Sequence, residues 1–351
     1  MSNEGDIKKR KLDHLELCAS DQVSFKEQTT LLECVRFLHS SLPELSLDEI
    51  DLSVRFLGKE LRAPILIAGM TGGHERSREI NRGLARVAEE RGYAFGLGSQ
   101  RALLRDPSLR STYEVRDIAP TLPLLGNLGV IQARELEAKV IRDSLASLGA
   151  DALCLHMNPA MELIQEEGDR DFRGGLRTFE RLGSELGLPI IAKETGAGIS
   201  FDTAHALHQI GIRYIDTSGA GGTSWVGVET LRAEGARQRL GELLWDWGIP
   251  TAASIVHAVR AGHHTIATGG IQTGLDIARA IALGADLAGI ARGAYQAFHE
   301  GGEASVHALF DQIELELRSV MLLVGAADLA ALQDAPKLIR GELRDYLELI
   351  E

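Results

Sequence analysis

The chain has 351 residues, of which 44% are apolar and 25% are charged, and its formal net charge is −13. This is ordinary globular composition, with enough apolar material for a large core. The acidic balance argues against binding to nucleic acid or to an anionic membrane, because both partners attract basic surfaces.

The cysteines and the chain start indicate where the protein works. Cys18, Cys34 and Cys154 are odd in number and form no CxxC or Cys/His pair, so we expect reduced thiols. The start MSNEGDIKKRKLDH lacks an apolar signal core, and no run approaches the ~18 apolar residues of a membrane span. We therefore expect a cytoplasmic protein.

The chain divides into three segments by pattern. Residues 1–62 form an N-terminal arm with helical pieces, of which Lys26–Leu38 is one. Residues 63–302 alternate short apolar runs with amphipathic stretches, and residues 303–351 are predicted as C-terminal helices. No Pro/Ser/Gly linker separates them, so we expect a single domain with extensions at both ends.

Eight apolar runs in the central segment predict strands buried on both faces. They are Ala63–Met70, Ala94–Gly98, Leu122–Leu128, Ala152–Met157, Pro189–Lys193, Tyr214–Thr217, Thr265–Gly269 and Leu287–Ala291. Helical patterns lie between them, such as Arg76–Arg91, Glu135–Leu148, Gly174–Leu186 and Leu275–Leu283. Eight such units in order favour an α/β protein of the closed (β/α)8, or TIM, barrel type over an open sheet.

A weak internal repeat fits this reading. Leu148–Asp151 and Leu283–Asp286 share the sequence Leu-Gly-Ala-Asp, and each leads from a helix into a strand four units apart. Glycine at a helix C-terminus is the usual way to make that turn. Duplication of half a barrel and chance reuse of a common loop both explain the repeat.

Polar or glycine residues follow all eight predicted strands, where barrel enzymes form their active sites. The residues after the seventh and eighth strands indicate a specific ligand. Gly269 and Gly270 allow backbone N–H groups to approach an anion, and Arg292 adds positive charge. Gly274 and the helix near Leu275 are expected to add a helix dipole. The pattern predicts a phosphate site between these two loops.

Lys193 ends a buried strand and so needs a partner or a chemical role. It can stabilise negative charge on a reduced flavin ring, form a Schiff base, or pair with Glu194. The sequence alone leaves these three alternatives open.

Taken together, the motifs resemble those of the FMN-dependent, type 2 isopentenyl-diphosphate isomerases, from about Arg10 to Ala326. The likeness rests on Arg10-Lys11-x-x-His14, Met70-Thr-Gly-Gly73, Gly98-Ser-Gln-Arg101, Asn127-Leu-Gly129, His156-x-Asn-Pro159, Gly168-Asp169, Lys193-Glu194-x-Gly-x-Gly198, Gly219-Ala-Gly-Gly-Thr-Ser-Trp225 and Thr268-Gly-Gly270. The resemblance implies interconversion of isopentenyl and dimethylallyl diphosphate without net redox change. Reduced FMN would serve as acid and base, with NADPH as the reductant and Mg²⁺ as a second cofactor.

The resemblance also assigns site residues. The implied FMN contacts are Gly69, Met70, Thr71, Ser99, Asn127, Lys193, Ser218, Thr223, Gly269, Gly270, Ile271, Gln272, Ala291 and Arg292. The implied substrate contacts are Arg10, Lys11, His14, Ser99, Gln100, Arg101 and Asn158, with His156 and Lys193 as catalytic residues and Glu162 as the Mg²⁺ ligand. Family members are homotetramers or homo-octamers, so Arg10 and Lys11 are expected to reach a neighbouring subunit's site.

One position departs from the family pattern. Met161 stands where the family has a glutamine that contacts the substrate, and a thioether can neither donate a hydrogen bond nor relay a proton. Ala160 and Gly69 also replace larger residues. Met161 is the third residue assigned to the catalytic site, and Met161→Gln is expected to raise activity.

Three other functions remain as alternatives. One is a diverged member that acts on another prenyl diphosphate with little isomerase activity, and another is a flavin-loaded protein without turnover. A 2-hydroxy-acid oxidase would use the same barrel and phosphate site. Those oxidases place a histidine after the sixth strand, and Thr217–Trp225 contains none.

Overall fold

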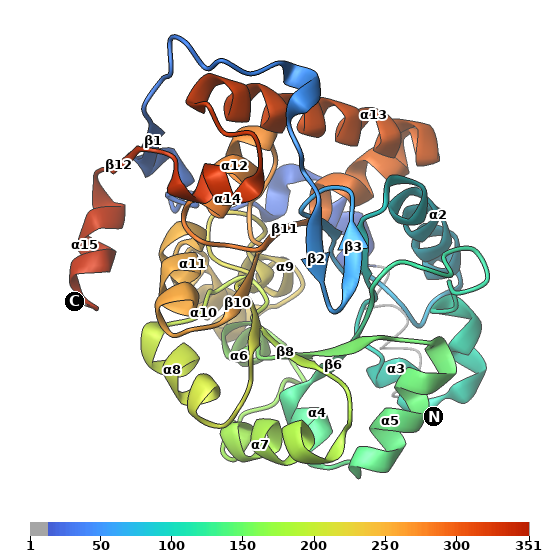
Figure 1. The fold of residues 1–351 in the computed structure, drawn as a ribbon. Coiled ribbons are helices and arrows are strands. Elements are labelled where there is room, and N and C mark those ends of the chain that lie inside the picture. The colour runs from blue at the N-terminus through green and yellow to red at the C-terminus, as the bar shows by residue number, and fades with distance from the viewer. Residues whose placement is uncertain (1–12, 351) are drawn as a thin grey trace.

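Eight parallel strands close into a barrel at the centre of the molecule (Figure 1). The computed structural model describes residues 13–350. Around the barrel the strands follow chain order, and the last pairs with the first. They are β4 (Ile65–Ile67), β5 (Ala94–Gly96), β6 (Leu124–Gly129), β7 (Ala152–His156), β8 (Ile190–Lys193), β9 (Tyr214–Asp216), β10 (His264–Ala267) and β11 (Leu287–Ile290). Each overlaps one predicted apolar run, which confirms the (β/α)8 barrel.

Helices follow the strands along the chain and surround the barrel (Figure 1). They are α2 (Glu75–Arg91), α3 (Arg101–Arg105), α4 (Val130–Arg134), α5 (Ala138–Leu148), α6 (Pro159–Ile164), α7 (Gly175–Glu185), α8 (Phe201–Gln209), α9 (Trp225–Thr230), α10 (Gly235–Leu243), α11 (Thr251–Arg260) and α12 (Gly274–Ala282). The predicted helices near residues 76, 174 and 275 are confirmed. The stretch from Glu135 is helical only from Ala138, after the separate short helix α4.

A hairpin closes one end of the barrel. Its strands, β2 (Val54–Phe56) and β3 (Lys59–Leu61), bring Phe56 and Leu61 into the apolar cluster that fills the barrel interior. The Phe56 ring packs edge-on against Tyr214, the first residue of β9, with 6.1 Å between ring centres. The hairpin therefore seals the end where the strands begin, and a ligand can enter only where they end.

The Leu-Gly-Ala-Asp repeat makes the same loop twice. Asp151 accepts a hydrogen bond from the Leu124 backbone N–H at 2.8 Å, and Asp286 accepts one from Thr265 at 2.7 Å. In both copies the aspartate carboxylate thus holds the incoming strand to the start of the preceding one. This contact gives a structural reason for the aspartate in both copies of the motif.

The predicted helix at Lys26–Leu38 is wrong. The backbone N–H groups of Lys26 and Glu27 donate to the Asp246 carboxylate at 2.8 and 2.7 Å, and the chain then runs extended to a short 3-10 turn, η2 (Leu32–Cys34). Strand β1 (Val35–Phe37) follows and pairs antiparallel with β12 (Lys337–Ile339). Tertiary partners more than 200 residues away therefore override the local helical pattern.

The C-terminal part is mostly helical, as expected. Helix α13 (Arg292–Val324) crosses the expected boundary after residue 302 and breaks its helical backbone there, at Gly301 and Gly302. Helices α14 (Leu329–Asp334) and α15 (Glu342–Glu348) follow on either side of β12. Further 3-10 turns are η1 (Asp21–Val23), η3 (Leu47–Glu49) and η4 (Pro107–Thr112). Among residues 13–350, no helix is long and apolar enough to cross a membrane.

Candidate active site

A cavity of about 640 Å³ opens where the barrel strands end. It brings together almost every described residue that the sequence analysis selected. Those lining it are His14, Gly69, Met70, Thr71, Ser99, Arg101, Asn127, His156, Asn158, Met161, Glu162, Lys193, Ser218, Thr223, Gly269, Gly270, Ile271, Gln272, Ala291 and Arg292. Gln100 lies behind the wall, with its side-chain oxygen beside Gly126. Arg10 and Lys11 lie outside the described residues.

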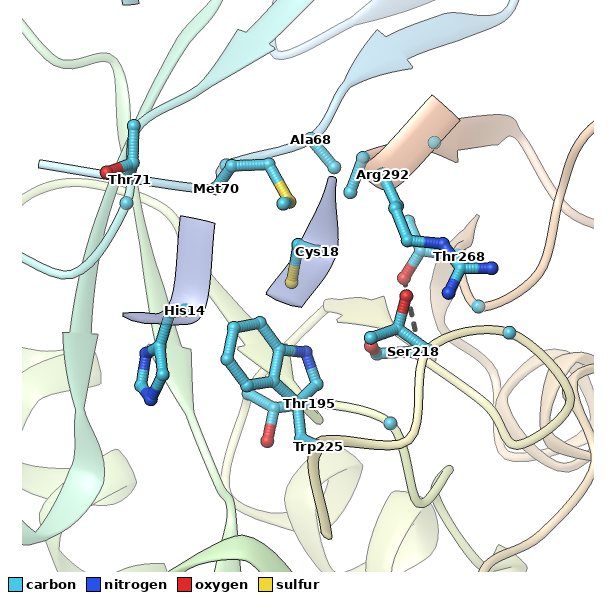
Figure 2. A pocket seen from close by; sticks show the side chains of 18 of the residues that line it. His14, Cys18, Ala68, Met70, Thr71, Thr195, Ser218, Trp225, Thr268 and Arg292 are labelled. Atoms are coloured by element: carbon cyan, nitrogen blue, oxygen red, sulfur yellow. Dashed lines mark hydrogen bonds between the residues drawn. The ribbon is translucent and has the colours of Figure 1, made fainter. Parts of the chain in front are cut away.

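One end of the cavity is built to hold an anion. Gly269 and Gly270 have φ of 103° and 71°, and a Cβ on Gly222 would overlap the Gly270 backbone nitrogen, so the two loops approach as only glycine allows. The Arg292 guanidinium reaches this end beside Thr268 and Ser218 (Figure 2). Its Nη2 donates to Ser24 at 2.9 Å, while the buried Nη1 has no hydrogen-bond partner among residues 13–350. A phosphate oxygen would supply the missing hydrogen-bond acceptor for Nη1.

The helix dipole at this end comes from α13 instead of the predicted α12. The first N–H groups of α12 are occupied: Gly274 donates to Glu316 at 2.7 Å, and Asp276 and Thr273 cap each other. No side chain caps α13, whose first residues Ala291, Arg292 and Gly293 line the cavity. The expectation that the helix near Leu275 faces the phosphate is therefore wrong, and the uncapped helix that begins at Arg292 takes its place.

Lys193 is paired within the barrel, but not with Glu194 as one alternative supposed. Its Nζ donates to Asp216 at 2.8 Å, and the other Asp216 oxygen accepts a hydrogen bond from Thr268. Asp216 is almost fully buried, so this pair fixes the lysine at the edge of the cavity. The Glu194 carboxylate instead accepts hydrogen bonds from the backbone N–H groups of Thr195 and Ala197. Burial raises the pKa of Glu194 to about 7.

His156 sits at the end of β7 in a fixed orientation. Its Nδ1 lies 2.7 Å from the Asn127 side-chain oxygen, so that nitrogen carries the proton. Burial, with help from the positive charges of Lys193 and Arg101, lowers the pKa of His156 to about 4. The ring is thus a neutral hydrogen-bonding group at neutral pH, with Nε2 available as an acceptor.

Helix α6 places a carboxylate in the cavity. Glu162 is buried; its Oε1 accepts from Asn158 Nδ2 at 2.9 Å and its Oε2 from the Asp169 backbone N–H at 2.8 Å. Each oxygen keeps a lone pair for a cation. Within the described chain no three His, Cys, Asp or Glu side chains group as a metal site. One carboxylate suits Mg²⁺, which takes much of its coordination from water and substrate phosphate.

The N-terminal segment contributes a wall to the cavity, with His14, Leu15 and Cys18 lining it. His14 lies 2.8 Å from the buried Glu229 carboxylate and packs edge-on against Trp225. Cys18 and Trp225 lie between His14 and Arg292 in the cavity (Figure 2). Burial raises the pKa of Cys18 to about 12, so its thiol is an apolar wall group. His14 and Trp225 both lie in motifs that the sequence analysis singled out, whereas nothing in the sequence pointed to Cys18 as a residue of this wall.

Two backbone features fit a ligand-binding surface. Ser218 has φ of 36°, a conformation that residues other than glycine rarely adopt, and its carbonyl accepts from Gly196 and Gly198. At Gly69 a Cβ would overlap the Leu97 carbonyl oxygen of the neighbouring strand. This backbone therefore has no room for the larger residue that Gly69 replaces.

Comparison with known proteins places this cavity in a family. A family model described as FMN-dependent dehydrogenase matches residues 4–238 and 157–339. Solved structures of a mandelate oxidase with an FMN adduct (TM-score 0.64, 16% identity, 93% of this chain and 95% of that one) and of a lactate oxidase from Pediococcus acidilactici (TM-score 0.67, 15% identity, 97% and 95%) share the fold.

The sequence relatives are much closer. An isopentenyl-diphosphate delta-isomerase of Methanosarcina acetivorans is 44% identical over 345 residues, which are 97% of this chain and 94% of the relative. The isomerase of Halobacterium salinarum is 42% identical over 346 residues, 97% and 95% of the two chains. The chain therefore belongs to the type 2 isopentenyl-diphosphate delta-isomerases, within the FMN-dependent dehydrogenase family.

Proposed function

We propose that this protein interconverts isopentenyl diphosphate and dimethylallyl diphosphate in the cavity at the end of the barrel. One observation carries the proposal: the cavity that holds the phosphate-suited loops also contains a buried carboxylate, Glu162, together with the cation Arg101. Gly269, Gly270 and Arg292 suit the FMN phosphate, while Glu162 on α6 would hold a Mg²⁺ ion that a diphosphate can bind. A protein that bound only FMN would need only the phosphate-suited loops.

The reaction needs an acid and a base near an alkene. A proton must be added to the terminal carbon of the double bond. Another must be removed from the methylene attached to the other alkene carbon, with no net redox change. Reduced FMN, when bound, supplies an acid–base group and an electron-rich ring. Lys193, held by Asp216, would steady negative charge on that ring, while His156 and Asn127 would orient the substrate. Trp225 and Cys18 line the cavity and would exclude water from the hydrocarbon part of the substrate.

The diphosphate would bind near Glu162 with Mg²⁺. Glu162 would hold the cation, because a hard oxygen ligand suits it. Arg101, Asn158 and Ser99 line this part of the cavity wall and offer donors to phosphate oxygens. We extend the same role to His14, Gln100, Arg10 and Lys11 on the resemblance alone.

Other properties also rest on the resemblance. We propose NADPH as the physiological reductant and a homotetramer or homo-octamer in the cytoplasm. We further propose that residues 1–62 and 303–351 are extensions of a single barrel domain spanning 63–302.

The oxidase alternative has little support. The loop Thr217–Trp225 offers no histidine to accept a substrate proton, and the identity to the oxidases is only 15–16%. No oxygen consumption with 2-hydroxy acids is expected.

The test is turnover. Reduced holoenzyme with isopentenyl diphosphate and Mg²⁺ should form dimethylallyl diphosphate, and Glu162→Gln should require far more Mg²⁺. A matched change at an exposed carboxylate of another helix, Glu185→Gln, should have no effect. No product from enzyme with FMN bound and reduced would refute the proposal and favour a diverged substrate or a protein without turnover.

A further inference from the structure

A buried glutamine with no assigned role faces the same cavity. Gln165 follows directly after α6, and its side chain is only 5% exposed. Its amide Nε2 has no hydrogen-bond partner in the described part of the chain, although the residue lines the cavity. A buried amide donor is almost always paired, so one that faces a cavity indicates a ligand that completes it.

The position of Gln165 at the C-cap of α6 explains why it lines the cavity. Asn158, Met161, Glu162 and Gln165 are spaced i, i+3, i+4 and i+7, which places them on one face of a helix, and all four line the cavity. The Gln165 backbone is fixed as well: its N–H donates to the Met161 carbonyl at 3.1 Å, and its carbonyl accepts from Arg170 at 2.8 Å. The backbone that carries the side-chain amide is therefore held in place before any ligand arrives.

Resting on the proposed function, we propose that the Gln165 amide is a further ligand of the substrate diphosphate and donates through Nε2 to a phosphate oxygen. On the shared face Gln165 lies one turn beyond Met161 and next to Glu162, the carboxylate suited to the Mg²⁺ that accompanies a diphosphate. The only available polar atom at Met161 is a thioether that Asn158 already approaches at 3.9 Å. Gln165 thus supplies, one helical turn along the chain, the amide donor that position 161 lacks.

The test uses oxidised holoenzyme, in which binding is measured without turnover. Gln165→Met keeps the length of the side chain and removes the amide, and Leu163→Met on the exposed face of α6 is the matched control. The probes are isopentenyl diphosphate and inorganic pyrophosphate, titrated calorimetrically with Mg²⁺. The Kd for both should rise about tenfold to a hundredfold in Gln165→Met, the range for a hydrogen bond to a charged acceptor, and should stay unchanged in Leu163→Met.

Two further measurements separate a ligand from a structural role. The Tm of the Gln165→Met holoenzyme without substrate should equal or exceed that of the wild type, because an unpaired buried amide is removed. In turnover the variant should show a raised KM and a nearly unchanged kcat. Gln165→Glu keeps the shape but repels a diphosphate, and should bind more weakly still.

The opposite results are equally definite. A Kd within twofold of the wild type for both probes would overturn the assignment, and so would a Tm lowered by several degrees with loss of FMN. If the wild-type holoenzyme binds neither probe, the proposed function itself fails. That outcome differs from a loss confined to the Gln165 variants.

Discussion

Replacing Arg292 with methionine removes a cation from the expected FMN phosphate site while keeping the side chain's length. The wild-type guanidinium donates one hydrogen bond to Ser24, and its buried Nη1 has no partner within residues 13–350. Asp21 lies 3.9 Å away and is mostly exposed, so it neutralises little of the charge. The guanidinium is therefore held ready for an anion.

The magnitude follows from that one available donor. A hydrogen bond between charged groups is worth about 1.5–3 kcal/mol, so Arg292→Met should raise the Kd for FMN about 10- to 150-fold. The flavin-free protein should be no less stable than the wild type, because a buried unpaired nitrogen is lost. Flavin fluorescence quenching on reconstitution measures the Kd, and thermal unfolding measures the stability.

A second arginine provides the control. Arg279 on α12 has a side chain as well buried as that of Arg292, 13% against 11% exposed, and its Nε also has no partner in the described chain, but it does not line the cavity. Arg279→Met should leave the Kd for FMN unchanged. An unchanged Kd in Arg292→Met, or an equal loss in both variants, would refute the assignment of the phosphate to the uncapped end of α13.

Three further changes test other parts of the site. Met161→Gln should raise kcat about two- to tenfold, the value of one added neutral hydrogen bond, and an unchanged or lower rate in steady-state assays would count against our reading of this position. Burial raises the pKa of Glu194 from 4.5 to about 7, so its protonated form stabilises the fold below pH 4.5 and that stability is lost as the pH rises through 7. Relative to the wild type, Glu194→Gln should therefore gain about 3 kcal/mol of unfolding free energy between pH 4.5 and 7 in urea titrations, and a pH-independent difference would contradict this. Gly69→Ser should lower the unfolding free energy by about 1–3 kcal/mol, because its Cβ overlaps the Leu97 carbonyl, whereas equal stability would show that the strand ends can separate.

The barrel and the location of the site follow from the sequence because both depend on short-range patterns. Each strand is a run such as Ala152–His156 whose apolar residues are buried on both faces. Once the strands are placed in order, the ends of all eight must meet, so residues as distant as Thr71 and Arg292 can be assigned to one cavity.

The contacts that the sequence did not predict are those between distant segments. Asp216 lies inside an apolar run, and only the closed barrel places it beside Lys193. The segment from Lys26 has a helical pattern, but its N–H groups bond to Asp246. The helix near Leu275 was predicted to face the phosphate. Its first backbone N–H groups instead donate to side chains of the protein, in a capping box with Thr273 and a bond to Glu316.

The most direct test of the central claim is solvent proton transfer during isomerisation. Reduced holoenzyme, isopentenyl diphosphate and Mg²⁺ are combined in D₂O, and the product is observed by NMR. Our account predicts dimethylallyl diphosphate carrying deuterium in a methyl group, with no net oxidation of the flavin. Substrate recovered unchanged, from enzyme shown to bind it with FMN reduced, would contradict the account.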